Sequence, residues 1–277
     1  MMAGKKAPAP APTRQLPNAG KGTVFLTYKG GLQTIVSALA ERLRHEGVEL
    51  RTGVTVKSLN KPGDGMYEVM LEDGDGGTVQ ERFDGIVLTS PAYATAKLLS
   101  GLPAAEYLAN LEYVSVANVV LVFRAQDVAS PMDGSGFVVP RSEGRTITAC
   151  TWTSAKWLHT APEGSIVLRC YVGRSGEQDW VKLSDEELVE RVRADIRDIH
   201  GIEAVPEFYE VTRLPKSMPQ YAVGHLESIA ELERQLEAYL PGVYATGAAF
   251  RGVGLPDCIG QARQTAERLV ARIAEGK

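Results

Sequence analysis

One segment near the C-terminus constrains the fold of this chain more than any other: a short apolar strand, a glycine-rich loop and a long helix follow directly on one another. The strand covers 243–246, and glycines stand behind it at 247, 252, 254 and 260. Glycine has no Cβ, so such a backbone can approach a flat or charged ligand closely. The N-terminus of the following helix presents unpaired N–H groups and partial positive charge. The segment therefore predicts a site for an anion or an electron-rich ring.

The bulk composition is that of a soluble globular protein. With 277 residues, the chain can form one large domain or two. Its hydrophobic content of 44% and charged content of 23% are ordinary, and its net charge of -4 argues against a nucleic-acid partner. No apolar run approaches the roughly 20 residues that a transmembrane helix needs. The expected location is the cytoplasm, free or at the periphery of a membrane.

The cysteines and histidines do not predict a metal site. The three cysteines, at 150, 170 and 258, form no CxxC motif, and an odd number does not suit a framework of disulfides. The four histidines show neither HxxxH nor HExxH spacing. We expect reduced cysteines and no bound metal.

Hydrophobic periodicity predicts helices and strands over most of the chain. One amphipathic helix begins at Leu32 and stops at Gly47, and a capping box formed by Ser184 and Glu187 predicts another helix over 185–199. Strands are predicted at 67–71, 78–83, 114–124, 136–140, 146–153, 165–172, 208–213 and 243–246. The fold class is therefore mixed α/β, with a β-rich middle section.

This order predicts two domains, one of which is built from both ends of the chain. Residues 1–22 form a disordered arm rich in Lys and Pro. Residues 23–112 form the first part of one domain and 215–277 its C-terminal part. The β-rich domain covers 113–214.

Four segments together resemble the flavin-dependent oxidases of porphyrinogens, protoporphyrinogen oxidase and its bacterial coproporphyrinogen-oxidising relatives, within the flavin amine oxidase group. The similarity covers nearly everything from Thr23 to the C-terminus. The segments are Lys29-Gly30-Gly31-Leu32, Ala149 to Thr153 with Trp157 and Arg169 to Gly173, Met218-Pro219-Gln220-Tyr221 with Gly224-His225, and Gly252 to Ile259.

The resemblance implies a partial FAD-binding domain interrupted by a β-rich substrate-binding domain. It implies FAD as the cofactor and the dehydrogenation of coproporphyrinogen III or protoporphyrinogen IX to the porphyrin in haem biosynthesis, with oxygen or another electron acceptor. Two alternatives stay open: another flavin amine oxidase or a carotenoid desaturase, and a truncated fragment without catalysis. The sequence does not choose between the two porphyrinogens, and it does not give the oligomeric state.

One departure from the family pattern concerns its N-terminal motif. The family begins with a strand, a Gly-rich loop and a helix that hold the FAD diphosphate, and no GxGxxG motif occurs in this sequence. We therefore expect the C-terminal portion of a longer enzyme, with a missing N-terminal half as a partner.

The resemblance places cofactor contacts in the glycine loop. It implies that Gly247 and Ala248 lie near the ribityl and diphosphate part of FAD. It also implies that the backbone of Gly252, Val253 and Gly254 meets the pyrimidine edge of the flavin, where a helix N-terminus stabilises negative charge. The alternative is an ordinary tight turn from strand to helix.

Further site residues are also implied by the resemblance. Val56 matches the position whose backbone binds the adenine, although it could be an ordinary strand valine. Trp157 and Val139 match walls of the substrate cavity, and core packing is the alternative for both. Tyr221 is expected to order a turn, and His225 to stand at a helix N-terminus. No side chain is predicted as a catalytic base, because the flavin takes the hydride.

Overall fold

The computed structural model describes residues 26–63, 65–129, 132 and 134–275. The chain divides into two units, Met1–Leu50 and Arg51–Lys277. The arm predicted at 1–22 lies outside the described residues. The predicted domain boundaries within 23–277 stay a prediction.

The first unit contains helix α1, Gln33–His45, which confirms the helix predicted from Leu32. Gly47 adopts a φ of 80°, and the N–H of Val48 bonds to the carbonyl of Leu43, which closes the C-terminus of the helix. No residue of α1 is buried, and the apolar side chain of Val36 is exposed. The apolar side chains that the periodicity predicts on one face of α1 are thus exposed or half-buried.

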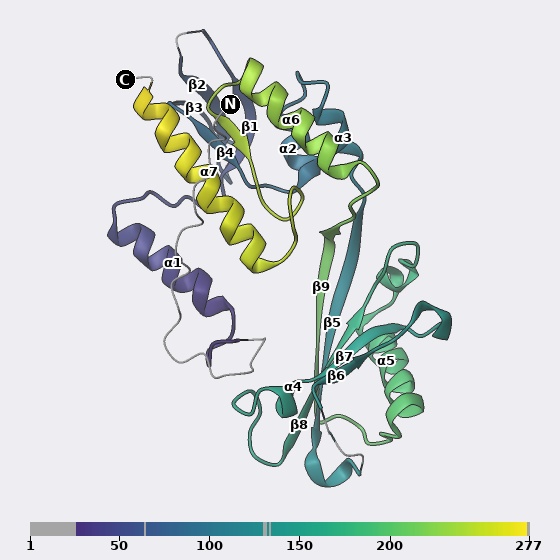
Figure 1. Cartoon of the computed structure of the whole chain (residues 1–277). Coiled ribbons are helices and arrows are strands. Elements are labelled where there is room, and N and C mark those ends of the chain that lie inside the picture. The colour runs from purple at the N-terminus through teal and green to yellow at the C-terminus, as the bar shows by residue number, and fades with distance from the viewer. Residues whose placement is uncertain (1–25, 64, 130–131, 133, 276–277) are drawn as a thin grey trace, which may run out of the picture. The chain divides into compact units, whose positions relative to one another are not determined.

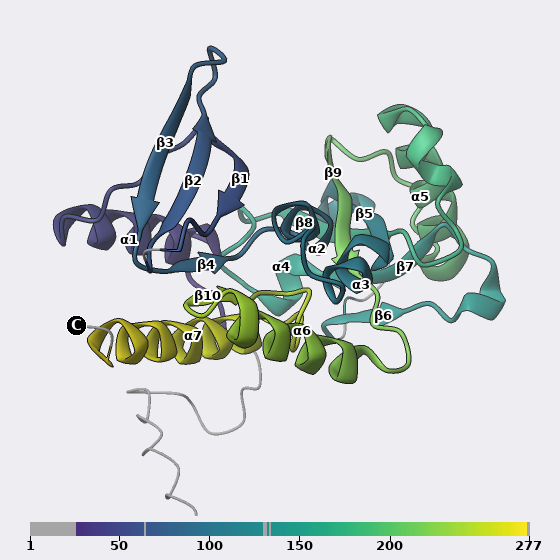
Figure 2. The same ribbon diagram turned by 90° about the horizontal axis from the view of Figure 1, so that it is seen from above.

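The second unit begins with an antiparallel three-stranded sheet, seen at the top of Figure 2. Its strands are β1 (Thr55–Asn60), β2 (Tyr67–Glu72) and β3 (Thr78–Phe83). The carboxylate of Asp73 accepts hydrogen bonds from the N–H groups of Asp75 and Gly77, so it orders the hairpin turn between β2 and β3.

A second, parallel pair of strands joins segments far apart in the sequence. Strand β4 (Ile86–Leu88) pairs with β10 (Val243–Ala245). Helices α2, α3, α6 and α7 belong to the same part of the unit (Figure 1). Their bounds are Ala92–Leu98, Ala105–Asn110, His225–Tyr239 and Leu255–Glu275. Buried side chains from β2, β4, α2, α3, α6 and β10 form one hydrophobic core, which includes Tyr67, Leu88, Leu108, Leu232 and Phe250.

The β-rich section forms a five-stranded sheet with the order β6-β7-β8-β5-β9. The strands are Gly136–Val138, Ile147–Trp152, Ser165–Val172, Tyr113–Arg124 and Phe208–Pro219, in that order across the sheet. Helix α5, Asp185–His200, begins at the predicted capping box of Ser184 and Glu187. Its buried side chains meet those of the sheet in a second hydrophobic core.

Short helical elements complete the second unit. They are α4 (Thr153–Lys156), η1 (Ala125–Asp127), η2 (Arg141–Glu143) and η3 (Asp179–Lys182). Within the part of the chain that the structure describes, no helix is both long and apolar enough to cross a membrane.

Candidate functional site

The carboxyl ends of β4 and β10 meet at one edge of the parallel pair. The N–H of Thr246 donates to the carbonyl of Leu88 at 3.0 Å, directly after both strands end. The glycine loop leaves the sheet at this point, beginning with Gly247. In open α/β sheets, ligands bind outside the carboxyl ends of parallel strands. The topology therefore puts the loop predicted as the cofactor contact at the edge where a ligand is expected.

Two glycines of this loop have conformations that other residues adopt poorly. Gly247 has a φ of 123° and Gly252 a φ of 140°. A Cβ added at Gly252 would also lie 2.8 Å from the Cβ of Asp257, which is closer than real contacts allow. The loop therefore needs glycine at 252 for its backbone angle and for space.

Tyr221 joins two points of the loop through one hydroxyl group. Its Oη donates to the carbonyl of Ala248 at 2.6 Å and accepts from the N–H of Gly252 at 3.0 Å. Burial raises the pKa of this phenol, so the hydroxyl keeps its hydrogen at neutral pH. The carbonyl of Gly252 accepts a further hydrogen bond from Gln261 on α7, at 3.3 Å.

His225 is the first residue of α6, as predicted, and its ring also reaches the loop. The ring stacks on that of Tyr221, with centroids 3.8 Å apart and planes inclined by 8°. Its Nε2 lies 2.7 Å from the carbonyl oxygen of Phe250. From the sequence we expected Tyr221 to order a turn and His225 to begin a helix, and we did not predict that they contact the loop. The only hint was that both belong to the Met218–His225 segment that resembles the family.

The backbone amides directly after Gly252 are the groups of this loop that could meet a ligand. Among the described residues, no hydrogen bond joins the N–H of Val253 or Gly254 to the protein. Helix α7 begins immediately afterwards, at Leu255. Free N–H groups and the positive end of the helix dipole can stabilise an anion or an electron-rich ring edge. The N–H of Gly252 donates to Tyr221, and the predicted flavin contacts of Gly252, Val253 and Gly254 stay predictions.

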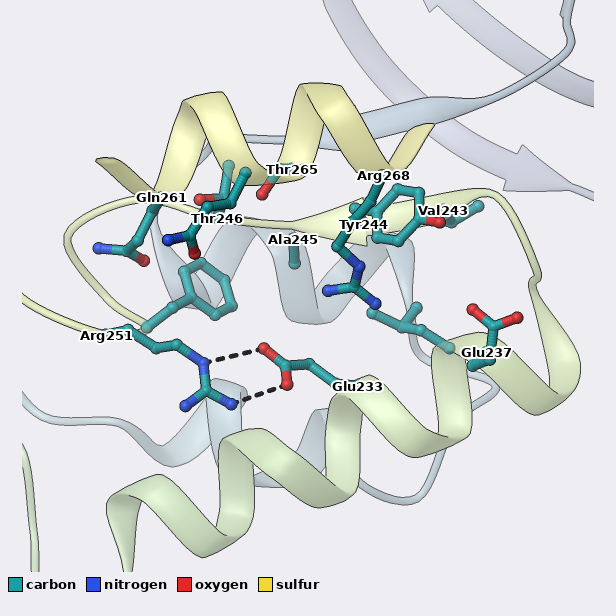
Figure 3. Close-up of a pocket in the computed structure, with 13 residues that line it drawn as sticks. Glu233, Glu237, Val243, Tyr244, Ala245, Thr246, Arg251, Gln261, Thr265 and Arg268 are labelled. Carbon is teal, nitrogen blue, oxygen red and sulfur yellow. Dashed lines mark hydrogen bonds and ion pairs between the residues drawn. The ribbon is translucent and has the colours of Figure 1, made fainter. Parts of the chain in front are cut away.

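A cavity of about 150 Å³ lies beside the loop, between α6 and α7 (Figure 3). All three residues of β10 and the following Thr246 line it, so the cavity follows the edge of the strand and not one face. The hydroxyl of Thr246 is buried and has no hydrogen-bond partner among the described residues. Arg251 and Glu233 form a two-point ion pair across the mouth, with N–O distances of 3.0 and 2.7 Å.

Val56 lies away from the glycine loop, on β1. A β-bulge interrupts the pairing of β1 with β2 between Val56 and Ser58. Such bulges leave backbone groups unpaired, which suits the predicted main-chain contact. Val56 lines a largely apolar cavity of about 310 Å³ together with Leu71, Phe83 and Val87. The adenine contact of Val56 stays a prediction.

The two predicted substrate residues lie in the β-rich section. Trp157 is half-buried after α4, and the ammonium of Lys156 stands 5.6 Å from the centroid of its ring. Val139 is half-buried against the core of the five-stranded sheet, and its N–H donates to the carbonyl of Thr148. Both substrate contacts stay predictions. In the described part of the chain, no three His, Cys, Asp or Glu residues cluster as metal ligands.

The comparisons with known proteins give the family. The sequence profile of the family described as flavin containing amine oxidoreductase matches residues 11–270. This chain belongs to that family. The predicted resemblance is therefore confirmed, and the description of the family as flavin containing agrees with FAD as the predicted cofactor.

Within the family, the chain is similar to relatives named as coproporphyrinogen III oxidases. The chain is 41% identical over 263 residues to the coproporphyrinogen III oxidase of Bacillus subtilis (strain 168), covering 95% of this chain and 54% of that protein. It is 38% identical over 261 residues to the coproporphyrinogen III oxidase of Staphylococcus aureus (strain NCTC 8325 / PS 47), covering 94% and 55%. The chain thus spans about half the length of the curated relatives that it matches.

A solved structure supports the same fold. It is a crystal structure of a protein from Exiguobacterium sp. 255-15, named as a candidate protoporphyrinogen oxidase. The TM-score is 0.78 at 34% identity, and the match covers 90% of this chain and 52% of that one. The predicted mixed fold of the flavin amine oxidase type is confirmed.

Proposed function

We propose that this chain serves in the FAD-dependent oxidation of a porphyrinogen, coproporphyrinogen III or protoporphyrinogen IX, to the porphyrin in haem biosynthesis. The observation that carries the proposal is its 41% identity to a coproporphyrinogen III oxidase over 95% of the chain. The position of the glycine loop at the carboxyl ends of β4 and β10 supports it, because a ligand binds at such an edge.

In this proposal the loop holds the flavin through backbone groups. The free amides of Val253 and Gly254, with the N-terminus of α7, would face the pyrimidine edge of the ring. Gly247 and Ala248 would lie near the ribityl and diphosphate part. The backbone of Gly252, whose N–H donates to Tyr221, would lie at the same edge of the ring. The backbone of Val56 would bind the adenine.

The side chains of this chain orient and shield the substrate in this proposal. Bound FAD supplies the hydride acceptor of the dehydrogenation, so the protein need not provide a strong base. Trp157 and Val139 would form part of an apolar wall, which suits a bulky tetrapyrrole. Oxygen or another acceptor would take the electrons onward.

We further propose an N-terminal half as partner, supplied by the part of the relatives that this chain does not match. The second edge of β10, which pairs with no strand among the described residues, supports it. The carbonyl of Gly242 and the N–H of Thr246 form hydrogen bonds with the β4 side. Along a strand the backbone groups of successive residues point to alternate edges, so those of Ala245 point to the edge away from β4. The sheet of β4 and β10 has only two strands, fewer than most sheets, so a strand of the partner could extend it at this edge.

The exposed side of α7 supports the same partner. Ile259 and Val270 are 59% and 67% exposed, whereas Thr265 on a neighbouring face is buried. An apolar helix stripe of this kind is normally packed against another element. A strand along β10, followed by polypeptide over α7, would cover both features.

The test is reconstitution. The chain would be co-expressed with the part of the Bacillus subtilis relative that it does not match, and the purified complex examined for flavin absorbance. We expect bound FAD, and porphyrin fluorescence to appear from coproporphyrinogen III or protoporphyrinogen IX, assayed in parallel. The N-terminal part alone is the control. Absence of FAD from the complex, or oxidation of amines in place of porphyrinogens, would contradict the proposal.

A further inference from the structure

Two aromatic side chains, Tyr221 and His225, contact the glycine loop, and a third, Tyr107, bonds His225 from behind. Tyr221 follows β9, His225 begins α6 and Tyr107 lies on α3. Tyr107 is 118 residues from His225, and His225 is 25 residues from Phe250, so tertiary folding brings these hydrogen-bonded residues together. Together Tyr221 and His225 bond the loop at Ala248, at Phe250 and at Gly252.

The hydrogen bonds of His225 fix its tautomer. The carbonyl oxygen of Phe250 can only accept, so Nε2 must carry the hydrogen of that 2.7 Å contact. In the neutral ring, Nδ1 is then the acceptor, and the hydroxyl of Tyr107 donates to it at 2.7 Å. The ring is only 4% exposed. His225 is thus a fully satisfied, buried donor to the loop.

The two hydrogen bonds of Tyr221 link the start of the loop to Gly252. One Oη holds the carbonyl of Ala248 and the N–H of Gly252, the residue with a φ of 140°. Removing the hydroxyl leaves both backbone groups without this partner, while the stacked ring can stay in place. The contact is therefore separable from the packing of the aromatic ring.

We propose that Tyr221 and His225 are positioning residues of the loop from Gly247 to Gly254. They hold the backbone in the conformation that leaves the amides of Val253 and Gly254 free for a ligand. The identity of that ligand, a flavin, rests on the proposed function. The loop conformation itself does not, so it can be tested on the chain alone.

The first experiment uses the full chain without FAD. Tyr221→Phe should raise hydrogen exchange of the Gly252 amide and tryptic cleavage after Arg251 about tenfold, because two hydrogen bonds are lost. Tyr209→Phe is the matched control, since Tyr209 is 39% exposed and Tyr221 40%. The melting temperature should fall by no more than about 4 °C. Unchanged exchange and cleavage would overturn the inference.

The second experiment uses the reconstituted complex. Tyr221→Phe should weaken FAD binding about tenfold and shift the visible flavin spectrum, which a contact serving stability alone would not do. His225→Gln keeps a donor for Phe250 and should bind FAD more tightly than His225→Ala. An FAD affinity and spectrum equal to wild type in Tyr221→Phe would overturn the positioning role.

The two experiments separate the inference from the proposed function. If the wild-type complex binds no FAD while Tyr221→Phe still loosens the loop, the proposed function fails and the assignment of Tyr221 to the loop is supported. If His225→Ala does not fold, Tyr221→Phe decides the outcome, because it removes a single hydroxyl from a residue that is 40% exposed.

Discussion

At the scale of single residues, Gly252 sets the geometry of the loop. Both backbone polar groups of Gly252 are hydrogen-bonded: its N–H donates to Tyr221, and its carbonyl accepts from Gln261. A side chain at this position would require a strained φ and would press on Asp257. The loop can therefore be altered locally by adding one methyl group.

Gly252→Ala should destabilise the chain by about 1–3 kcal/mol and abolish FAD binding in the reconstituted complex. Gly260→Ala is the matched control, because a Cβ there meets nothing within 4 Å and alanine favours the helix. Thermal melting of both variants measures the difference. Equal melting temperatures for Gly252→Ala and wild type would contradict the strain argument.

Residue patterns predict the loop but not the contacts that hold it. The glycines and the helix start stand together in the sequence, so local rules find them. Tyr221 and Gly252 are 31 residues apart, and their bond depends on how β9, α6 and β10 pack. No periodicity in the sequence reports such a contact.

At the scale of elements, β10 can be tested through its open edge. Ala245→Pro removes an N–H that points away from β4, so the pairing with β4 should persist while a strand added at the open edge loses a donor. We expect assembly with the N-terminal half to weaken about tenfold or more, measured by titration of the two parts. Ala245→Gly keeps the N–H and is the control. Equal weakening in both variants would show that the edge is not used.

Strand β9 shows where element prediction stops. The sequence predicts a strand at 208–213, and the structure continues it to Pro219 through Pro215. Proline normally ends a strand because it lacks an N–H, but β9 is an edge strand of its sheet, where half of these donors have no partner. Lys216 adopts a positive φ of 44°, and the register with β5 shifts between Val114 and Val116. The helix with the capping box was predicted well because its signal is local.

At the scale of the whole molecule, the second unit has two separate hydrophobic cores. One surrounds β4 and β10 and includes Phe250 of the glycine loop. The other lies between the five-stranded sheet and α5. All three tryptophans of the sequence, at 152, 157 and 180, belong to the β-rich section. Tryptophan fluorescence therefore reports on the β-rich core alone.

This separation predicts an uneven response to FAD in the reconstituted complex. FAD at about 100 times its Kd should stabilise the core next to the loop by about 2.7 kcal/mol, because it binds only the folded form. The transition measured by circular dichroism should move to higher temperature by several degrees. The transition measured by tryptophan fluorescence should move less, when any tryptophan of the N-terminal part is replaced by phenylalanine so that the signal comes from this chain. The same scan with riboflavin, which lacks the diphosphate and adenine, is the control. Equal shifts by both probes would show that the two cores unfold together.

The open edge of β10 has a consequence for the chain inside a cell. The second edge of β10 pairs with no strand among the described residues, and the side chains of Ile259 and Val270 on α7 are exposed and apolar, so other copies or nascent chains can bind these features. A copy that does not bind the N-terminal half soon after synthesis would be bound by chaperones or degraded by proteases, which recognise such surfaces. The abundance of this chain would then follow the supply of the complementing polypeptide, whatever the rate of its own synthesis.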